Sequence, residues 1–111
     1  MSEIKLLKLI KNTTGKYKMT AVVFDTSTQQ ESRLNFGARG YNDYTIYYKE
    51  EGKEVADKKK SAYLERHGAD KAGEDWTKSG RKTAGFFSRW VLWNKSTIEA
   101  SVRDMKKRFF S

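Results

Sequence analysis

Basic side chains gather in the last third of the sequence. Residues 78–111 hold nine Lys and Arg residues against two Asp and Glu residues, whereas residues 1–77 hold 14 against 12, and the formal net charge of the chain is +9. A concentrated positive field attracts nucleic acid, anionic lipid or an acidic protein surface. We expect nucleic acid, with DNA as its expected form, bound through phosphates without reading of base sequence. The expected phosphate contacts are Arg81, Lys82, Arg89, Lys95, Arg103, Lys106, Lys107 and Arg108.

A second group of candidate contacts lies in the segment FGARGYNDYT. Arg39 stands between two glycines, and Tyr41 and Tyr44 follow it. A guanidinium pairs with phosphate or carboxylate, and tyrosine rings stack on a ligand's rings. These three residues are therefore typical of a surface that binds a partner. The alternative is a tight loop whose tyrosines pack on a helix. The segment is not a phosphate-binding P-loop, because the Lys and the Ser or Thr of that motif are missing.

The segment GFFSRWVLWNK concentrates aromatic rings beside Arg89 and Lys95. Helical spacing puts Phe86 and Trp90 on one stripe, and we expect both rings in the core because so much apolar area is unfavourable in water. At about 100° per residue, Trp93 lies about 60° off that face. We therefore expect Trp93 at the margin, where it stacks on a base, fills a pocket on a protein partner or covers the joint between two helices.

Residues suited to catalysis or metal binding are sparse. His67 is the only histidine, the chain has no cysteine, and the carboxylates stand in no recognisable catalytic or metal-binding spacing. A thiolate zinc site and a cysteine nucleophile are excluded. We expect a binding protein rather than an enzyme, with no catalytic residue, no metal and no cofactor.

Hydrophobic periodicity predicts three strands followed by three helices. The strands have alternating apolar positions, and the first two form a hairpin; they span residues 4–12, 16–25 and 32–37. The helices have apolar positions at three- and four-residue spacing; they span residues 54–68, 84–93 and 96–110. The last helix carries a capping box, Ser96 with Glu99, and one apolar stripe. The stripe consists of Ile98, Val102, Met105 and Phe109.

These elements predict a small α+β fold in which a three-stranded antiparallel sheet packs against about three helices of the C-terminal half. The 111 residues are expected to form a single basic domain, with strands in residues 1–37, a connecting loop in residues 38–53 and helices in residues 54–111. No apolar run approaches the ~20 residues that span a bilayer, so we expect no membrane insertion and a soluble protein used inside a cell.

Three blocks of the sequence resemble a family of small uncharacterised proteins encoded by large and giant DNA viruses of eukaryotes, the mimivirus-like and phycodnavirus-like groups. The blocks are FGA-x-G-x-x-DYT at residues 36–45, Tyr-x-x-Arg-His at residues 63–67, and Ser-x-Trp-x-Leu-Trp-Asn at residues 88–94. The resemblance covers residues 16–109. The chain departs from the family pattern in IYYKEEGKEVADKKKS, which is expanded, and in lacking a proline after WNK. The resemblance implies a viral origin and gives no established activity.

Two functions follow from these observations. In the first, the protein is packaged in the virion or acts in the viral factory of the host cytoplasm, where it binds nucleic acid without sequence specificity. In the second, it is a minor capsid or core protein whose basic end docks on an acidic virion protein. A steep salt dependence of DNA binding favours the first, and co-purification with capsid after nuclease treatment favours the second. The oligomeric state does not follow from the sequence.

Overall fold

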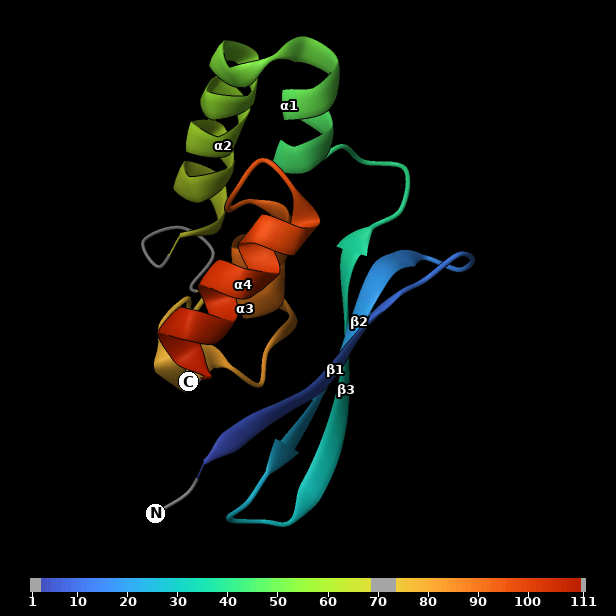
Figure 1. Ribbon diagram of the computed structural model, residues 1–111, viewed down its shortest axis with the longest axis vertical. Helices are drawn as coiled ribbons and strands as arrows, with labels where there is room; N and C mark the ends of the chain where they lie inside the picture. Colours follow the sequence, from blue (N-terminus) through green and yellow to red (C-terminus); the bar gives the residue numbers. More distant parts are fainter. Residues whose placement is uncertain (1–2, 69–73, 111) are drawn as a thin grey trace.

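A computed structural model describes residues 3–68 and 74–110. Three strands, β1 (Ile4–Lys11), β2 (Tyr17–Asp25) and β3 (Gln30–Ala38), form an antiparallel sheet in the order β1-β2-β3 (Figure 1). Alternation along β2 directs Met19, Ala21 and Val23 to the core, as the sequence pattern predicts. The three-stranded sheet and the α+β class are therefore confirmed.

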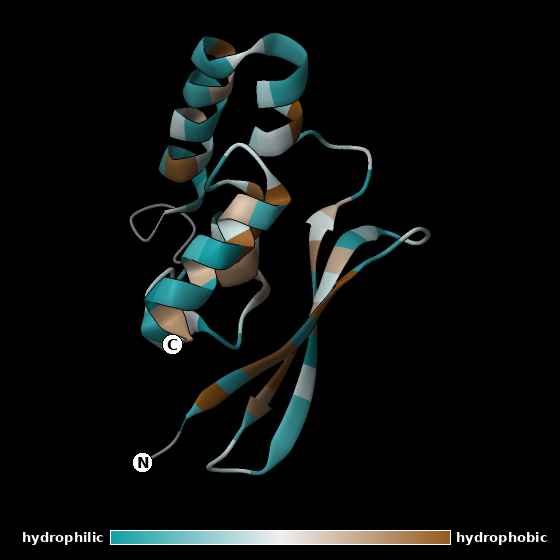
Figure 2. Cartoon of the chain, viewed as in Figure 1, coloured by the Kyte–Doolittle hydropathy of each residue, from teal (hydrophilic) through white to brown (hydrophobic). Residues whose placement is uncertain are grey.

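Helices follow the sheet in the chain; in Figure 1 those of the last third lie beside the sheet, and the first two lie above it. They are α1 (Tyr44–Glu51), α2 (Lys53–His67), the 3₁₀ turn η1 (Lys78–Gly80), α3 (Ala84–Phe87), the π-helix η2 (Ser88–Leu92) and α4 (Ile98–Phe109). In Figure 2, both strands and helices carry hydrophobic and hydrophilic residues, as expected where each element has one face on the core. The side chains of Phe36, Phe86, Phe87, Val91 and Met105 are buried and join the sheet to α3, η2 and α4.

Helix α1 lies within residues 38–53, which the sequence analysis assigned wrongly to a connecting loop. The helix begins at Asp43, whose side chain accepts hydrogen bonds from the backbone N–H groups of Thr45 and Ile46 at 3.0 and 3.2 Å. Gly52, at φ 91°, then allows the chain to reverse into α2. The tyrosines of this segment favour strands as much as helices, so its helix propensity was too weak to predict α1. The helix is stabilised by its cap and by its packing on α2.

The aromatic segment after α3 departs from α-helical geometry. The backbone N–H of Trp93 donates to the carbonyl of Ser88 at 3.2 Å, the five-residue step of a π-helix. This wider turn invalidates the rotation of 100° per residue on which the predicted side-chain directions depended. Phe86 is buried as expected, but the predicted places of the tryptophans are wrong: Trp93 is only 8% exposed, whereas Trp90 is partly exposed.

The last helix is close to its prediction. Met105 is fully buried, and the other residues of the apolar stripe are partly buried against the core. The capping residue is Thr97 rather than Ser96, because the Thr97 hydroxyl accepts from the backbone N–H of Ala100 at 3.1 Å. Glu99 lies on the helix surface, where its carboxylate contacts Lys11 of β1.

We expect Trp93→Ala to destabilise the protein by about 3–5 kcal/mol, because a buried ring would leave a large cavity. Trp90→Ala should cost at least about 1 kcal/mol less, since part of that ring is already in water. Urea unfolding of both variants would measure the two losses. A larger loss for Trp90 would contradict the packing described above.

Candidate functional site

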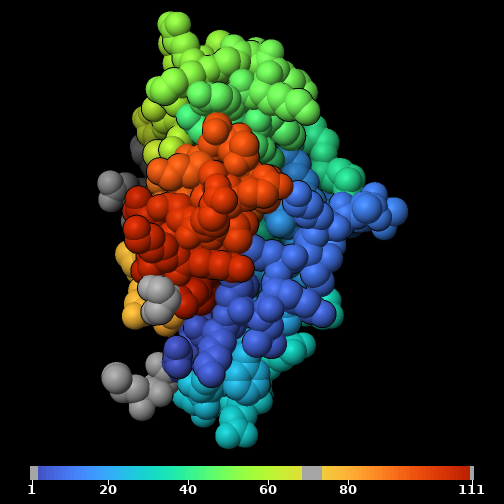
Figure 3. All heavy atoms as spheres, in the orientation of Figure 1, coloured from blue at the N-terminus to red at the C-terminus, as the bar shows by residue number. Residues whose placement is uncertain are grey.

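A shallow groove separates β1 from α4. Its floor is apolar and its rim carries charged side chains; the lining residues are Leu9, Lys11, Met19, Ile98, Glu99, Val102 and Lys106, around a volume of about 440 Å³. Figure 3 shows α4, in red and orange, lying directly against the blue N-terminal strands on this face. Lys11 Nζ lies 3.3 Å from the Glu99 carboxylate, and both side chains are exposed. We call this feature the basic groove.

Cations from both elements surround the basic groove. Lys106 also lines a second hollow, next to Lys5 and Phe110. Arg103 lies one turn from both Glu99 and Lys106 on α4, so it projects on the same side of the helix. Within residues 3–68 and 74–110, no carboxylate lies within ion-pair distance of Lys5, Arg103 or Lys106. Their charges are therefore available to an external anion.

The remaining predicted cations of the C-terminal region fall into two groups. Lys95, which precedes α4, and Lys107, which lies on α4, are both exposed. The guanidinium of Arg81 instead donates to the Phe109 carbonyl at 3.1 Å. Lys82 Nζ lies 3.0 Å from the Asp25 carboxylate, and Arg108 lies 3.0 Å from Asp104. A hydrogen bond from the Ser27 hydroxyl and, to a lesser degree, one from Lys82 lower the pKa of Asp25 below its ordinary value.

Arg89 is the most enclosed of these cations. It donates to the Trp93 carbonyl at 2.7 Å and stands 4.2 Å from the centroid of the Trp90 ring. Arg108 lies 5.2 Å from the same ring. Burial lowers the pKa of Arg89. Arg89 thus supports the fold directly, as a cation over an aromatic ring.

The three predicted contact residues of the FGARGYNDYT segment have different surroundings in the structure. Arg39 donates to the carbonyls of Gly15 and Asn12 at 2.7 and 2.8 Å, and so closes the turn between β1 and β2. Tyr44 is buried, and its hydroxyl donates to Asp57 at 2.7 Å. Tyr41 is 73% exposed and points to a pocket. Only this last residue keeps a ring free to receive a partner.

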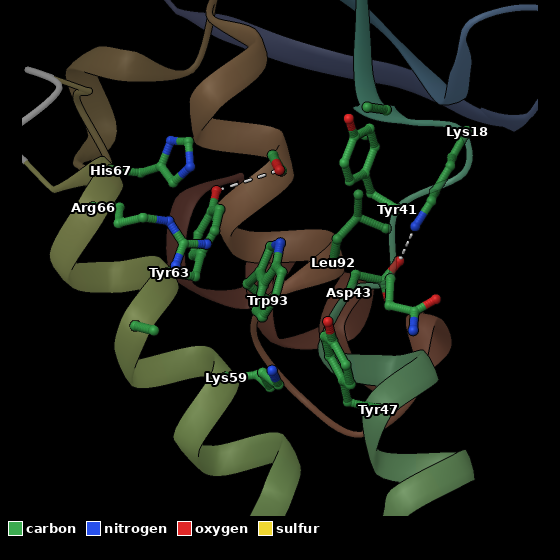
Figure 4. Close-up of a pocket in the computed structure, with 15 residues that line it drawn as sticks. Lys18, Tyr41, Asp43, Tyr47, Lys59, Tyr63, Arg66, His67, Leu92 and Trp93 are labelled. Atoms are coloured by element: carbon green, nitrogen blue, oxygen red, sulfur yellow. Dashed lines mark hydrogen bonds and ion pairs between the residues drawn. The ribbon is translucent and has the colours of Figure 1, made fainter.

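The pocket beside Tyr41 is formed by α1, α2, η2, the end of β3 and Lys18 of β2 (Figure 4). We call it the tyrosine pocket; it encloses about 420 Å³, and its lining includes Lys18, Tyr41, Asp43, Tyr47, Lys59, Tyr63, Arg66, His67, Leu92 and Trp93. None of its lining residues comes from β1 or α4, so it is a site separate from the basic groove.

Stacked rings form the inner wall of the tyrosine pocket. The Tyr63 and Trp93 rings are nearly parallel, with centroids 4.4 Å apart, and Tyr47 lies 6.3 Å from Trp93. The Tyr63 hydroxyl contacts the Ser88 hydroxyl at 3.3 Å, and burial raises the pKa of Tyr63 to about 12. Trp93, predicted to be a marginal contact, therefore forms part of the buried wall.

The rim of the tyrosine pocket is positively charged. Lys18 and Asp43 form an ion pair at 2.9 Å and balance each other. Lys59 and Arg66 are exposed, and neither has a carboxylate within ion-pair distance in the described part of the chain. His67 also lines the pocket, where its ring stacks on Tyr63 at 4.6 Å. The pocket thus combines aromatic rings with two uncompensated cations.

Three residues that line the tyrosine pocket were not predicted from the sequence: Lys59, Tyr63 and Arg66. Their spacing puts all three on one face of α2, which a helical reading of the segment can reveal. What the spacing could not reveal is that this face lies opposite Tyr41 and Tyr47. That arrangement depends on the unpredicted helix α1.

The fold and these two features define a small basic α+β protein with a cationic groove and a separate aromatic pocket. Comparison of the chain with protein families, curated proteins and solved structures finds no match. None of the helices in residues 3–68 and 74–110 is long and apolar enough to cross a membrane. In the same residues, no group of three or more His, Cys, Asp or Glu side chains is placed to hold a metal ion.

Alkaline pH should test the buried wall of the tyrosine pocket. The folded-state pKa of Tyr63 is about 12, above the ordinary value of 10.0, so its contribution to stability is fully present below pH 10.0 and is lost as pH rises toward 12. We expect Tyr63→Phe to lose less stability than the natural protein over this interval, in urea unfolding at successive pH values. Tyr41→Phe, at an exposed ring, is the control and should follow the natural protein. Identical profiles for all three proteins would show that Tyr63 is not buried.

Proposed function

We propose that the protein binds nucleic acid, with DNA as the expected form, by non-specific contacts of the basic groove and α4 with the phosphate backbone. The proposal is for a binding protein and not for an enzyme. The observation that carries it is the placement of cations of β1 and α4 around two adjoining hollows: Lys11 and Lys106 line the basic groove, and Lys5 lines the second hollow with Lys106. Arg103 projects on the same side of α4. The charge bias of the C-terminal region alone would favour an anionic partner without defining a surface.

The chemistry of these side chains favours phosphates over base edges. Lysines make up most of the set, and their long flexible side chains present point charges that follow a phosphate backbone without a fixed register. The groove is shallow and its floor is apolar, so it offers few groups that could read the pattern of donors and acceptors on base pairs. Binding should therefore tolerate any sequence.

The biological setting that we propose depends on the resemblance to proteins of large and giant DNA viruses. A non-specific DNA binder of such a virus would act on the genome, either packaged in the virion or in the viral factory of the host cytoplasm. Protein released from virions by nuclease would support packaging with DNA. Retention on the capsid after nuclease treatment would instead support docking on an acidic virion protein.

Binding to a mixed-sequence DNA duplex should weaken steeply as salt rises. Three or four phosphate contacts give a log–log slope of roughly −3 to −4, because each contributes about −0.9. Replacing both Arg103 and Lys106 by Gln should reduce the size of the slope by about 2. Fluorescence anisotropy over a salt series would measure it.

The matched control changes the same net charge elsewhere. Arg33→Gln with Lys58→Gln removes two exposed cations from β3 and α2, away from the basic groove, and should leave the slope nearly unchanged. A slope near zero for the natural protein would contradict nucleic-acid binding. An equal loss in both double variants would contradict the assignment to the groove.

A further inference from the structure

We propose that the tyrosine pocket binds one unpaired nucleotide of a nucleic-acid strand, with the base on the exposed ring of Tyr41 and the adjoining phosphates at Lys59 and Arg66. The proposal rests on the proposed function for the kind of ligand, and it deepens that function by adding a preference for unpaired bases. The pocket and the basic groove share no lining residue, so the two sites can be tested separately.

The dimensions of the pocket suit a small planar ligand. A volume of about 420 Å³ is within the usual range of small-molecule sites. Five elements of the chain contribute to its lining, and Figure 4 shows Tyr41 and Tyr47 across the pocket from Tyr63 and Arg66. A base inside a duplex is covered on both faces by its neighbours, so only a base that has left the stack could enter.

The rings that line the pocket are held in place before any ligand arrives. Tyr47 is fixed between Trp93, 6.3 Å away, and Lys59, whose Nζ lies 5.5 Å from the Tyr47 centroid. Tyr63 is held by its stack on Trp93. Tyr41 alone is largely exposed, so a base can cover its ring without displacing a protein contact. A preformed wall lowers the entropy lost on binding.

The charge of the pocket selects an anionic ligand. Lys59 and Arg66 stand seven residues apart on α2, which is about 10 Å along the helix axis. Two long side chains at this spacing can reach the phosphates on either side of one nucleotide. Among the lining residues that the structure describes, Asp43 is the only carboxylate, and it is paired with Lys18. An uncharged aromatic ligand would contact the rings but would leave Lys59 and Arg66 without an anionic partner.

Stacking in this pocket should not discriminate strongly among bases. Every nucleobase has a ring face that a tyrosine can stack on, whereas sequence preference needs donors and acceptors aimed at base edges. Two polar groups of the wall, the hydroxyls of Tyr63 and Ser88, already contact each other. The feature recognised is therefore the absence of a pairing partner.

Three DNA hairpins with the same stem, each closed by an ethylene glycol linker instead of a nucleotide loop, provide the test: one blunt, one with a short thymidine overhang, and one with an overhang of equal length made of abasic residues. The two overhangs carry equal charge and differ only in their bases. We expect the natural protein to bind the thymidine overhang about tenfold more tightly than the abasic overhang, the gain of one stacked base. Tyr41→Ala should reduce this ratio to near one, and Arg66→Gln should weaken binding to both overhangs.

Matched controls separate the pocket from other exposed residues. Tyr17→Ala removes an exposed tyrosine outside the pocket and should preserve the tenfold ratio. Arg33→Gln removes an exposed arginine outside the pocket and should weaken binding to the overhangs less than Arg66→Gln does. Equal affinity of the natural protein for the two overhangs would overturn the proposal, as would a ratio that Tyr41→Ala leaves intact. Saturable, Tyr41-dependent binding of thymidine monophosphate without any gain from the thymidine overhang would overturn the assignment to a strand.

The same measurements separate failure of the pocket from failure of the proposed function. Binding of the blunt hairpin reports on the basic groove, because that DNA offers only phosphates and paired bases. Loss of blunt-hairpin binding with an intact overhang ratio would overturn the basic groove and support the pocket. Salt-dependent binding of the blunt hairpin, together with equal affinity for the thymidine and abasic overhangs, would overturn the pocket and support the groove.

Discussion

The stack of Tyr63 on Trp93, with ring centroids 4.4 Å apart, is the contact on which the arrangement of the molecule depends. It attaches α2, and with it α1, to the π-helix that is packed on the sheet. A second attachment is the hydrogen bond from Lys60 Nζ to the Asn94 carbonyl at 2.8 Å. Without the stack, the α1–α2 pair would lose its main apolar contact with the body, and the tyrosine pocket would lose its inner wall.

The basic side chains divide into those that support the fold and those that remain available for a ligand. Arg39, Arg81 and Arg89 donate to backbone carbonyls, because a planar guanidinium can satisfy several acceptors at chain reversals and helix ends. Lysines around the basic groove and the tyrosine pocket mostly remain exposed. A high positive charge thus serves two purposes, and only the exposed part of it can govern the salt dependence of binding.

The extent to which the sequence predicted the site differs between its two parts. The charge of α4 follows from its own residues. Because the apolar stripe of this helix faces the core, Arg103 and Lys106 lie on its exposed side. The contribution of β1 to the groove was not predicted, since pairing of a strand with a distant helix is a matter of tertiary packing. Of the pocket's rings, Tyr41 and Trp93 were predicted as contacts from the sequence, whereas the places of Tyr47 and Tyr63 depend on how α1 and α2 pack.

Periodicity and capping in the sequence were sufficient to determine the three strands, the helix α2, the apolar stripe of α4 and the α+β class, because these follow from interactions between residues close in the chain. Tertiary structure alone decided that α1 forms, that the Ser88–Leu92 segment widens into a π-helix, and that Trp93 is buried while Trp90 is partly exposed. The physical reason is that one additional residue in a helical turn rotates every following side chain. Trp93, whose N–H closes this turn, packs on Tyr63, a residue 30 positions away in the sequence.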